Sequence, residues 1–395
     1  MHPGSRGRAH GLDRAMVRES GKKGGVSMGT PDEVPLRKKA TIRDVAKQAN
    51  VSIATVSRVV NKNYYVDPDT ILKVEKAIRD TGYYPDAIAR TMRRNVSFTI
   101  GLVVSDLNNT HFTLIAKMLD QVIEEQSYNL IVCSSDGNKE SENRYLRTLM
   151  SKKVDGLVMH TNGDNDALIA ELSRQIPIVL IYRKIQDEGF VGDFVGSEDF
   201  DGAYRLARHV LSFGHRRIGL ITGDLSISTG RERYAGFMKA LKEAGIRLSP
   251  SMMFSGSYHF ESGLEGAKKL LAARQSPSIL VALSNALAMG VMTYMKERQI
   301  LIPGDISFAS FGDLSNWELL YVQPTIIRQY PSRVGKFAGQ LLLKRIADRN
   351  RPPEVTLVPS PLIHGNSIAR VGPPPKGMEG EAGADASDSD ILHMC

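Results

Sequence analysis

Between Phe98 and Arg370, short apolar runs alternate with amphipathic segments, and this alternation is the strongest constraint on the fold. The runs lack a polar face, as expected for parallel strands covered on both sides. We expect such strands at Ile100–Val104, Leu130–Cys133, Leu157–Met159, Ile178–Ile181, Ile218–Ile221, Ile279–Leu283 and Ile306–Phe311. Helical patterns lie between most of them, for example at His111–Gln126, Asp201–Phe213, Arg231–Ala244, Gly263–Ala273, Leu287–Arg298 and Pro331–Arg349. The alternation is too long for a usual single domain and predicts an α/β fold with two doubly wound lobes.

The positive charge of the chain is concentrated at one end. Residues 1–97 carry a net charge of +9, whereas residues 98–395 carry −1, so the N-terminal part is expected to meet a polyanion. Two cysteines among 395 residues do not provide a disulfide framework, which favours a reducing compartment. No apolar segment of the signal-peptide type follows the basic start, and the uncharged stretch 275–295 is interrupted by serine, proline and asparagine. The sequence therefore predicts a cytoplasmic protein without membrane association.

Three short helices are expected between residues 41 and 84. Thr41 and Asp44 form a variant capping box for the first helix, and Ser52 is placed to cap the second. Asp67, followed by proline, opens a third helix that Gly82 closes. A turn of about three residues joins the first two helices, with small alanines at their crossing, and this spacing is that of a helix-turn-helix.

The second of these helices has the properties of a DNA recognition helix. Its valines form the core face, which leaves Ile53, Ala54, Thr55, Ser57 and Arg58 on the other side. Short side chains near the N-terminal end permit a close approach to base edges, and the arginine can donate two hydrogen bonds to a guanine. The helix N-terminus can also meet a phosphate. The alternative is a helical hairpin with a purely structural role.

The stretch from Thr41 to Met92 resembles the DNA-binding head of the LacI/GalR family of bacterial transcription regulators. The resemblance continues to about Arg370 through the signatures Lys153-Val-Asp-Gly156, Gly214-His-Arg-Arg-Ile-Gly219, Arg233-Tyr-Ala-Gly-Phe237 and Ile302-Pro-Gly-Asp-Ile-Ser307. It implies two periplasmic-binding-protein-like lobes joined by three crossovers, with a small molecule in the cleft. It also implies a homodimer that reads a pseudo-palindromic, double-stranded operator. To the residues expected at the DNA it adds Thr41, Ser52, Asn61 and Tyr83.

The segment from Pro85 to Arg94 is similar to the hinge helix of this family, which orders on operator DNA and inserts an apolar side chain into the minor groove. Met92 stands where leucine is usual, and methionine can still act as an apolar wedge. The resemblance places Ala89 near the floor of the groove, and Arg93 and Arg94 near phosphates. The alternative is an ordinary linker.

The resemblance also places effector contacts around the cleft, beginning with the loop after the first strand. Arg233 corresponds to the arginine that commonly holds polar groups of the effector, and Tyr258 corresponds to an aromatic stacking position. The full set of expected effector contacts is Asp106, His111, Phe112, Arg183, Glu198, Arg233, Tyr258, Asn285 and Asp313. The alternative for each is a packed or solvent-facing side chain.

Three departures from the family pattern bear on the ligand. Glu198-Asp199 stands where Asp-Asn is common, Ser284-Asn285 stands where Asn-Asp is common, and Gly312-Asp313 moves a carboxylate by one position. A glycine cannot hydrogen-bond the hydroxyl groups of a neutral sugar. Because two arginines and a histidine are expected nearby, the predicted effector is a sugar or an acidic relative, such as a sugar acid or a phosphorylated sugar.

These assignments divide the chain into five parts. Residues 1–38 and 372–395 lack apolar periodicity and are predicted to be a disordered basic extension and a disordered acidic tail. Between them we expect a helix-turn-helix domain at 39–84, a hinge at 85–97, and an effector-binding and dimerisation domain at 98–371. The last domain is expected to have two lobes. One lobe comprises about 98–198 and 329–355, and the other about 199–328 and 356–371.

The function that these features predict is a ligand-responsive, sequence-specific DNA-binding regulator, and specifically a repressor. The sequence contains no Walker loop and no H-E-x-x-H, so no catalytic residues, metal or cofactor are expected. The alternative is a sugar-binding module of the transport type without regulatory DNA binding. Such a module would use both lobes but has no need of the basic head.

Overall fold

The computed structural model describes residues 40–61, 65–83, 96–274, 276–314 and 319–372. The chain forms two compact units, divided between Asp86 and Ala87, and each is described by itself. The expected basic extension, the expected hinge helix and all but the first residue of the expected acidic tail lie outside the described residues. No helix of the described ranges is long and apolar enough to cross a membrane.

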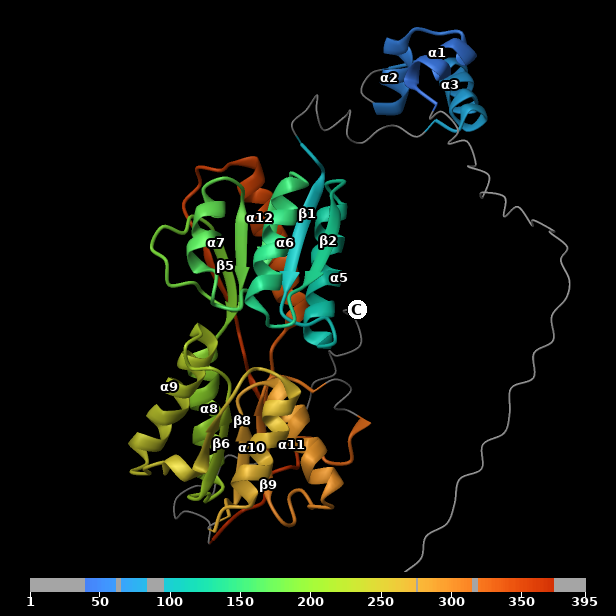
Figure 1. The fold of residues 1–395 in the computed structure, drawn as a ribbon. Coiled ribbons are helices and arrows are strands. Elements are labelled where there is room, and N and C mark those ends of the chain that lie inside the picture. Colours follow the sequence, from blue (N-terminus) through green and yellow to red (C-terminus); the bar gives the residue numbers. More distant parts are fainter. Residues whose placement is uncertain (1–39, 62–64, 84–95, 275, 315–318, 373–395) are drawn as a thin grey trace, which may run out of the picture. The chain divides into compact units, whose positions relative to one another are not determined.

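Three helices make up the head, in the positions that the capping signals predict (Figure 1). They are α1 (Ile42–Ala49), α2 (Ile53–Asn61) and α3 (Pro68–Thr81). The Asp44 carboxylate accepts hydrogen bonds from the amide and the hydroxyl of Thr41, both at 2.8 Å. The Ser52 hydroxyl accepts one from the Thr55 amide at 3.0 Å. Such caps satisfy amides that the start of a helix leaves without a partner.

A short turn fixes the packing of α1 against α2. Asn50 ends α1 in the left-handed conformation, with a φ of 52°, and its amide donates back to α1 carbonyl groups. Ala46 and Ala49 are buried together with Val56 of α2 in the core of the head. Their small side chains allow the two helices to pack closely, which turns the opposite side of α2 outward.

The first lobe is built on a six-stranded sheet. In spatial order its strands are β11 (Val355–Val358), β5 (Asp193–Ser197), β4 (Ile178–Ile181), β3 (Gly156–Met159), β1 (Thr99–Val104) and β2 (Asn129–Ser134). All neighbouring strands are parallel, and Ile100 of β1 pairs with Leu130 on one side and Gly156 on the other. Helices α5 (Thr110–Glu124) and α12 (Pro331–Ala347) cover one face, while α6 (Lys139–Ser151) and α7 (Asp166–Ser173) cover the other.

The second lobe repeats this plan. Its strands follow the order β12 (Leu362–Ile363), β10 (Thr325–Ile327), β9 (Ser307–Phe311), β8 (Ile279–Ala282), β6 (Ile218–Thr222) and β7 (Met253–Ser255). Only the pairing of β10 with β12 is antiparallel among the described strands. Helices α8 (Asp199–Ser212) and α9 (Ser228–Glu243) pack on one face, and α10 (Phe260–Leu271) and α11 (Asn285–Glu297) on the other. The expected pair of doubly wound lobes is thus confirmed.

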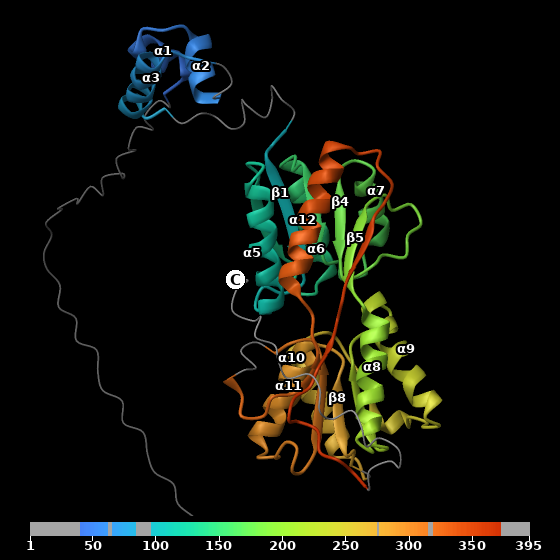
Figure 2. The same ribbon diagram turned by 180° about the vertical axis from the view of Figure 1, so that it is seen from behind.

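The chain crosses between the lobes three times. It leaves the first lobe after β5, returns from β10 to α12, and leaves again between β11 and β12 (Figure 2). The last crossing comes after Val358, slightly later than the boundary expected at residues 355 and 356, because β11 pairs with β5 along its whole length. Figure 2 also shows α12 lying beside α5, although more than 200 residues separate them in the sequence.

The strands that were not expected are short or only partly apolar. They are β5, β7, β10, β11 and β12. Strand β7 has three residues and β12 has two, while β11 lies at an edge of its sheet with Val355 and Leu357 exposed. Such strands do not produce a continuous apolar run, so their sequences carry little signal.

A buried ion pair ties α12 to β5 in the first lobe. The Nε and Nη2 atoms of Arg345 bind the two carboxylate oxygens of Asp193 at 2.6 and 2.7 Å. The arginine side chain is 3% exposed and the aspartate is fully buried. A second, longer contact of 3.4 Å joins this aspartate to Arg351. Because Arg345 lies in the last turn of α12, this pair anchors the end of the helix to the sheet.

Arg345→Ala is expected to lower the free energy of unfolding by about 3–5 kcal/mol, because it leaves the buried Asp193 carboxylate with one long ion pair. Urea denaturation followed by circular dichroism measures the change. Arg349→Ala, an exposed arginine two residues beyond α12, is the matched control and should change the value by less than about 0.5 kcal/mol. Equal effects of the two substitutions would contradict an anchoring role of the pair.

Candidate DNA interface and ligand cleft

The outward side of α2 carries most of the head residues expected to read DNA. Its exposed or partly exposed side chains include Ser52, Ile53, Ala54, Thr55, Ser57 and Arg58. Ile53 is 46% exposed, although it is apolar, whereas Val56 is completely buried. Small side chains and one arginine on the exposed side of a helix fit the floor of a major groove.

The remaining residues expected at the DNA differ in how the structure places them. Thr41 is exposed at the start of α1, whereas Tyr83 is partly buried and packs against the core of the head. Asn61 is the last residue of α2, and its side chain is outside the described structure. The hinge residues Ala89, Met92, Arg93 and Arg94 lie outside the described residues. Their contacts with DNA stay predictions.

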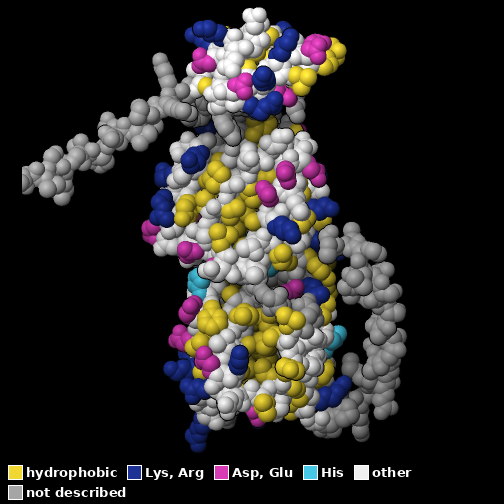
Figure 3. Space-filling view, turned by 90° about the vertical axis from the view of Figure 1, so that its right-hand side faces the viewer, with side chains coloured by type: hydrophobic (Ala, Val, Ile, Leu, Met, Phe, Trp, Pro, Cys, Tyr) yellow, Lys and Arg dark blue, Asp and Glu magenta, His cyan; other side chains and the backbone are white. Residues whose placement is uncertain are grey.

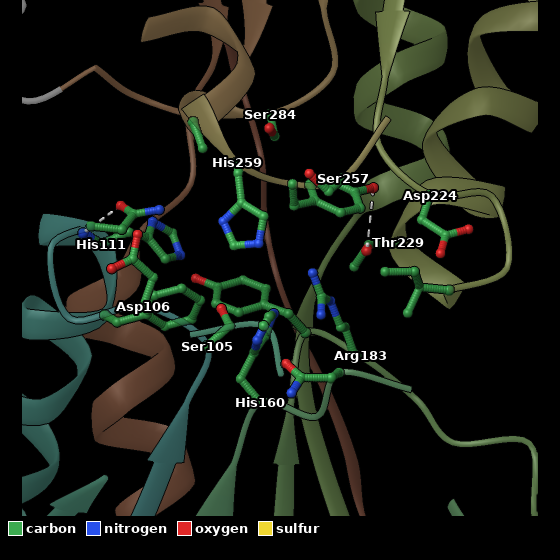
Figure 4. A pocket seen from close by; sticks show the side chains of 18 of the residues that line it. Ser105, Asp106, His111, His160, Arg183, Asp224, Thr229, Ser257, His259 and Ser284 are labelled. Carbon is green, nitrogen blue, oxygen red and sulfur yellow. Dashed lines mark hydrogen bonds between the residues drawn. The ribbon is translucent and has the colours of Figure 1, made fainter. Parts of the chain in front are cut away.

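A pocket of about 190 Å³ lies between the two lobes. Its lining comes from segments that follow β1, β2, β3 and β4 in the first lobe and β6, β7, β8 and β10 in the second. Within each sheet these strands are parallel, so their carboxyl ends meet at the same cleft, which is where open α/β sheets bind ligands. Figure 4 shows labelled side chains from both lobes pointing into this space.

Arg233 of α9 lines the pocket and is held by a buried ion pair. The side chain is almost fully buried, and its Nε donates to Oδ1 of Asp199 at 2.7 Å. Its Nη1 donates to the carbonyl of Leu283 at 2.9 Å, and its Cζ lies 4.0 Å from the ring centre of Phe311. Burial raises the pKa of Asp199, and the charge of Arg233 opposes that shift. The protein itself therefore compensates the positive charge of Arg233.

The glycine of the Arg233–Phe237 signature sets the distance between α8 and α9. A Cβ at Gly236 would lie 2.0 Å from the carbonyl oxygen of Phe200 in α8. Glycine alone allows the two helix backbones to approach so closely. This packing brings Arg233 of α9 within reach of Asp199 at the start of α8.

Arg183, the second buried arginine of the pocket, has no carboxylate partner. No Asp or Glu oxygen of the described residues lies within 4.0 Å of its guanidinium nitrogens. Its Nη1 donates to the carbonyl of Thr161 at 2.9 Å, while its Nε is buried without an acceptor. Its Cζ lies 5.1 Å from the ring centre of Tyr258 in the other lobe. Burial lowers the pKa of Arg183 to about 10, so the group stays positively charged at neutral pH.

Two histidines and a tyrosine form an aromatic cluster at the pocket. The ring centre of His160 lies 4.7 Å from that of Phe112, and His111 lies 5.0 Å from Tyr182. Burial and, secondarily, the charge of Arg233 lower the pKa of His111 to about 3. Burial also lowers the pKa of His160 well below its usual value and raises that of Tyr182. All three groups are therefore neutral at pH 7, and His111 adds no positive charge to the site.

Polar contacts connect the lobes around the pocket. The side-chain amide of Asn285 donates to Oδ1 of Asn109 at 2.9 Å across the cleft. Lys184, after β4, pairs with Glu232 of α9 at 3.1 Å, and its backbone amide donates to the hydroxyl of Ser228 at 2.9 Å. The side chains of the ion pair are partly exposed, so water can replace this contact when the lobes separate.

Seven of the nine residues expected at the effector line the pocket, namely Asp106, His111, Phe112, Arg183, Arg233, Tyr258 and Asn285. Glu198 and Asp313 are not among the lining residues. Glu198 pairs with Arg205 at 3.0 Å, and Asp313 pairs with Arg328 at 3.5 Å. Each of these two carboxylates thus pairs with an arginine outside the pocket. The carboxylate that reaches Arg233 belongs to Asp199, the residue after Glu198.

Several lining residues were not expected. His160 and Asn162 follow β3, Asp224 and Thr229 follow β6, and Gln329 follows β10. The first four come after apolar runs that predict parallel strands. Their position at carboxyl ends of strands is the signal that would have identified them. Gln329 had no such signal, because β10 has three residues and was not predicted.

Comparison with known proteins assigns both parts of the chain. Residues 41–86 match the family model of bacterial regulatory proteins of the lacI family. Residues 97–366 match the model of periplasmic binding proteins and the sugar binding domain of the LacI family. The HTH-type transcriptional repressor PurR of Haemophilus influenzae is 34% identical over 316 residues, which cover 79% of this chain and 92% of the relative.

Solved structures share the fold. The lac repressor dimer bound to operator and the anti-inducer ONPF has a TM-score of 0.73 at 23% identity, covering 84% of this chain and 100% of that chain. A LacI family regulator from Enterococcus faecium with bound ribose has a TM-score of 0.62 at 25% identity, covering 69% and 100%. Because the two family models span the head and both lobes, the chain belongs to the LacI family of bacterial transcriptional regulators.

Proposed function

We propose that this protein is a cytoplasmic repressor whose affinity for a specific double-stranded operator is controlled by a small molecule in the cleft. The observation that carries this proposal is the presence, in one chain, of an exposed recognition helix and a polar pocket between two lobes. The net charge of +9 on residues 1–97 supplies attraction to DNA phosphates, and the side chains of α2 supply contacts to bases. The name of the PurR relative supports repression as the sign of regulation.

The size of the pocket supports an effector about as large as a monosaccharide. Its volume of about 190 Å³ is smaller than the roughly 300–1,000 Å³ of sites for drug-sized ligands. Phe112 and Tyr258 offer apolar ring faces, and the asparagines and histidines of the lining offer hydrogen bonds to hydroxyl groups. The ribose bound to the Enterococcus faecium regulator is a ligand of this class. A transport module is not favoured, because residues 41–86 match the head of the regulators.

We propose further that the protein is a homodimer that reads inverted half-sites. Leu114 of α5, Val132 of β2 and Met289 of α11 are 42%, 36% and 43% exposed. These elements lie on the right-hand side of the lobes in Figure 1, and Figure 3 shows that side from the front. Hydrophobic side chains gather there on both lobes. Extended apolar patches of this kind mark interaction surfaces, and a second copy of the chain is the occupant we propose. A two-fold dimer requires a pseudo-palindromic operator.

Arg58→Ala is expected to weaken binding to the cognate operator by about 1–3 kcal/mol and to relax the preference at one base position, because a bidentate contact to a base is lost. Operator selection from random duplexes, followed by DNA titrations on the native protein and the variant, measures both effects. Arg79→Ala, which removes an exposed arginine from the end of α3, is the matched control. A loss of affinity without any change in base preference would reject a direct reading role for Arg58.

Arg233→Ala is expected to leave operator affinity without effector nearly unchanged and to remove most of the response to the effector. The probe is whichever of a panel of pentoses, hexoses and their acids shifts operator affinity most in the native protein. Since the substitution also leaves Asp199 buried without its partner, the double variant Asp199→Asn/Arg233→Gln keeps the test independent of stability. Lys239→Ala, on the exposed side of α9, is the control. A full response of both variants at the native effector concentration would place the effector site elsewhere.

Leu114→Glu is expected to shift the protein from dimer to monomer and to weaken operator binding together with dimerisation, because it puts a charge into the proposed apolar interface. Sedimentation velocity measures the oligomeric state. Val191→Glu is the control and should leave the dimer intact. Val191 has a similar exposure and precedes β5, which lies far from β2 in the strand order of the sheet. A native protein that sediments as a monomer would overturn the dimer.

A further inference from the structure

The two arginines of the pocket differ in how their charges are compensated. Arg233 has its own buried carboxylate, Asp199, at 2.7 Å. Arg183 is equally buried but binds only the carbonyl of Thr161 and faces the ring of Tyr258. A buried cation without a counter-ion is strongly unfavourable, and the structure supplies none within contact distance among the described residues.

The carboxylates that line the pocket do not contact Arg183. Asp224 and Asp164 are exposed, and Asp224 accepts a hydrogen bond from the amide of Ser226. Asp106 accepts one from the amide of Asn108. These three carboxylates line the pocket, but each is partly or fully in contact with solvent, where its charge is screened.

Glu142 is the one fully buried carboxylate close enough to influence Arg183. It accepts hydrogen bonds from the hydroxyl of Thr161, the amide of Asn162 and the side-chain amide of Asn165. Burial raises its pKa, and these hydrogen bonds and the charge of Arg183 oppose that shift. Since it acts through Thr161 and not by direct contact, it stabilises the position of Arg183 without occupying its free hydrogen-bonding edge.

The start of α9 adds a second source of positive electrostatic potential at the pocket. Its N-cap position is Ile227, no side chain caps it, and its first turn has no acidic residue. By contrast, Asn109 caps α5 and Ser284 caps α11 beside the same pocket. Ile227 and Thr229 line the pocket, and both Arg183 and Thr229 contact Tyr258, at 5.1 Å from the ring centre and 3.5 Å from the hydroxyl (Figure 4). The uncapped amides and the positive end of the helix dipole therefore meet the same space as the guanidinium.

We propose that Arg183 and the N-terminus of α9 form a subsite for a negatively charged oxygen group of the effector, namely a carboxylate or a phosphate ester on a molecule of monosaccharide size. This inference rests on the proposed function in taking the cleft as the effector site. It assigns the anion to Arg183 and leaves Arg233, which Asp199 neutralises, to hydroxyl groups. The Nε–Nη2 edge of a guanidinium can bind two oxygens of one such group.

Neutral groups around this subsite fit the rest of such a molecule. The Nδ1 of His160 and the hydroxyl of Tyr182 are buried without hydrogen-bond partners. Both residues line the pocket beside Arg183 and carry no charge at pH 7, as their shifted pKa values show. They offer hydrogen bonds to sugar hydroxyls without competing for the anion. The side chain of Asn162 adds a further polar contact at the same side of the pocket.

The test compares three probes on the full-length protein without DNA. D-Gluconate carries a carboxylate, D-glucose 6-phosphate carries a phosphate ester, and D-glucose is the neutral reference. Calorimetric titration of the native protein is expected to show at least about tenfold tighter binding of one anion than of glucose, because charge-assisted hydrogen bonds exceed neutral ones. Which anion binds distinguishes the carboxylate from the phosphate. Equal or tighter binding of glucose, or no binding of either anion, would overturn the proposal.

Arg183→Gln is expected to weaken binding of the preferred anion at least about tenfold and to leave glucose binding within about twofold. Arg183→Lys, which keeps the charge without the planar fork, should fall between Arg183→Gln and the native protein. Arg147→Gln removes an exposed arginine from α6 as the charge-matched control and should bind like the native protein. Native-like anion affinity in Arg183→Gln would reject the subsite. Because no DNA is present, failure of operator binding would reject the proposed function and leave this result standing.

Discussion

The buried ion pair between Arg233 and Asp199 is the interaction on which the cleft depends. Asp199 opens α8 directly after the first crossover, and Arg233 reaches it from α9 while also binding the carbonyl of Leu283 at the end of β8. One guanidinium therefore joins two helices and a strand end where the chain enters the second lobe. Separating these elements would leave a buried carboxylate without its partner, which is strongly unfavourable. The second lobe consequently presents a fixed wall to the ligand.

The two arginines of the pocket differ in whether a carboxylate compensates their charge. Within the described lining, Arg183 and Arg233 are the two cationic side chains, and only Arg233 has a carboxylate in contact. His111 and His160 are neutral because burial disfavours their protonated forms. The pocket therefore combines one buried positive charge that has no carboxylate in contact, neutral hydrogen-bonding groups, and the more exposed carboxylates Asp106, Asp164 and Asp224.

The fold and much of the site could be predicted from the sequence, because long apolar runs and capping residues report local structure. The helices of the head and the central strands follow from such signals, and Arg233 and Tyr258 follow from the family signatures. The short strands β7, β10 and β12 escaped prediction, since their pairing depends on neighbours far away in the sequence. The choice between Glu198 and Asp199 also depended on tertiary packing. The close approach of α8 and α9 at Gly236 decides which of these adjacent carboxylates reaches Arg233.

The polar contacts across the pocket determine how strongly a ligand can act. The Lys184–Glu232 pair is partly exposed, and pairs of that kind contribute about 0–1 kcal/mol. The Asn109–Asn285 hydrogen bond across the cleft adds about 0.5–1.5 kcal/mol. A ligand that binds residues of both lobes favours the arrangement in which it contacts both, by its differential affinity for that arrangement. Allosteric coupling free energies are typically about 1–3 kcal/mol, which is comparable to the sum of these contacts. Weak contacts at the cleft and a strong ion pair within one lobe are thus complementary requirements for a ligand-controlled switch.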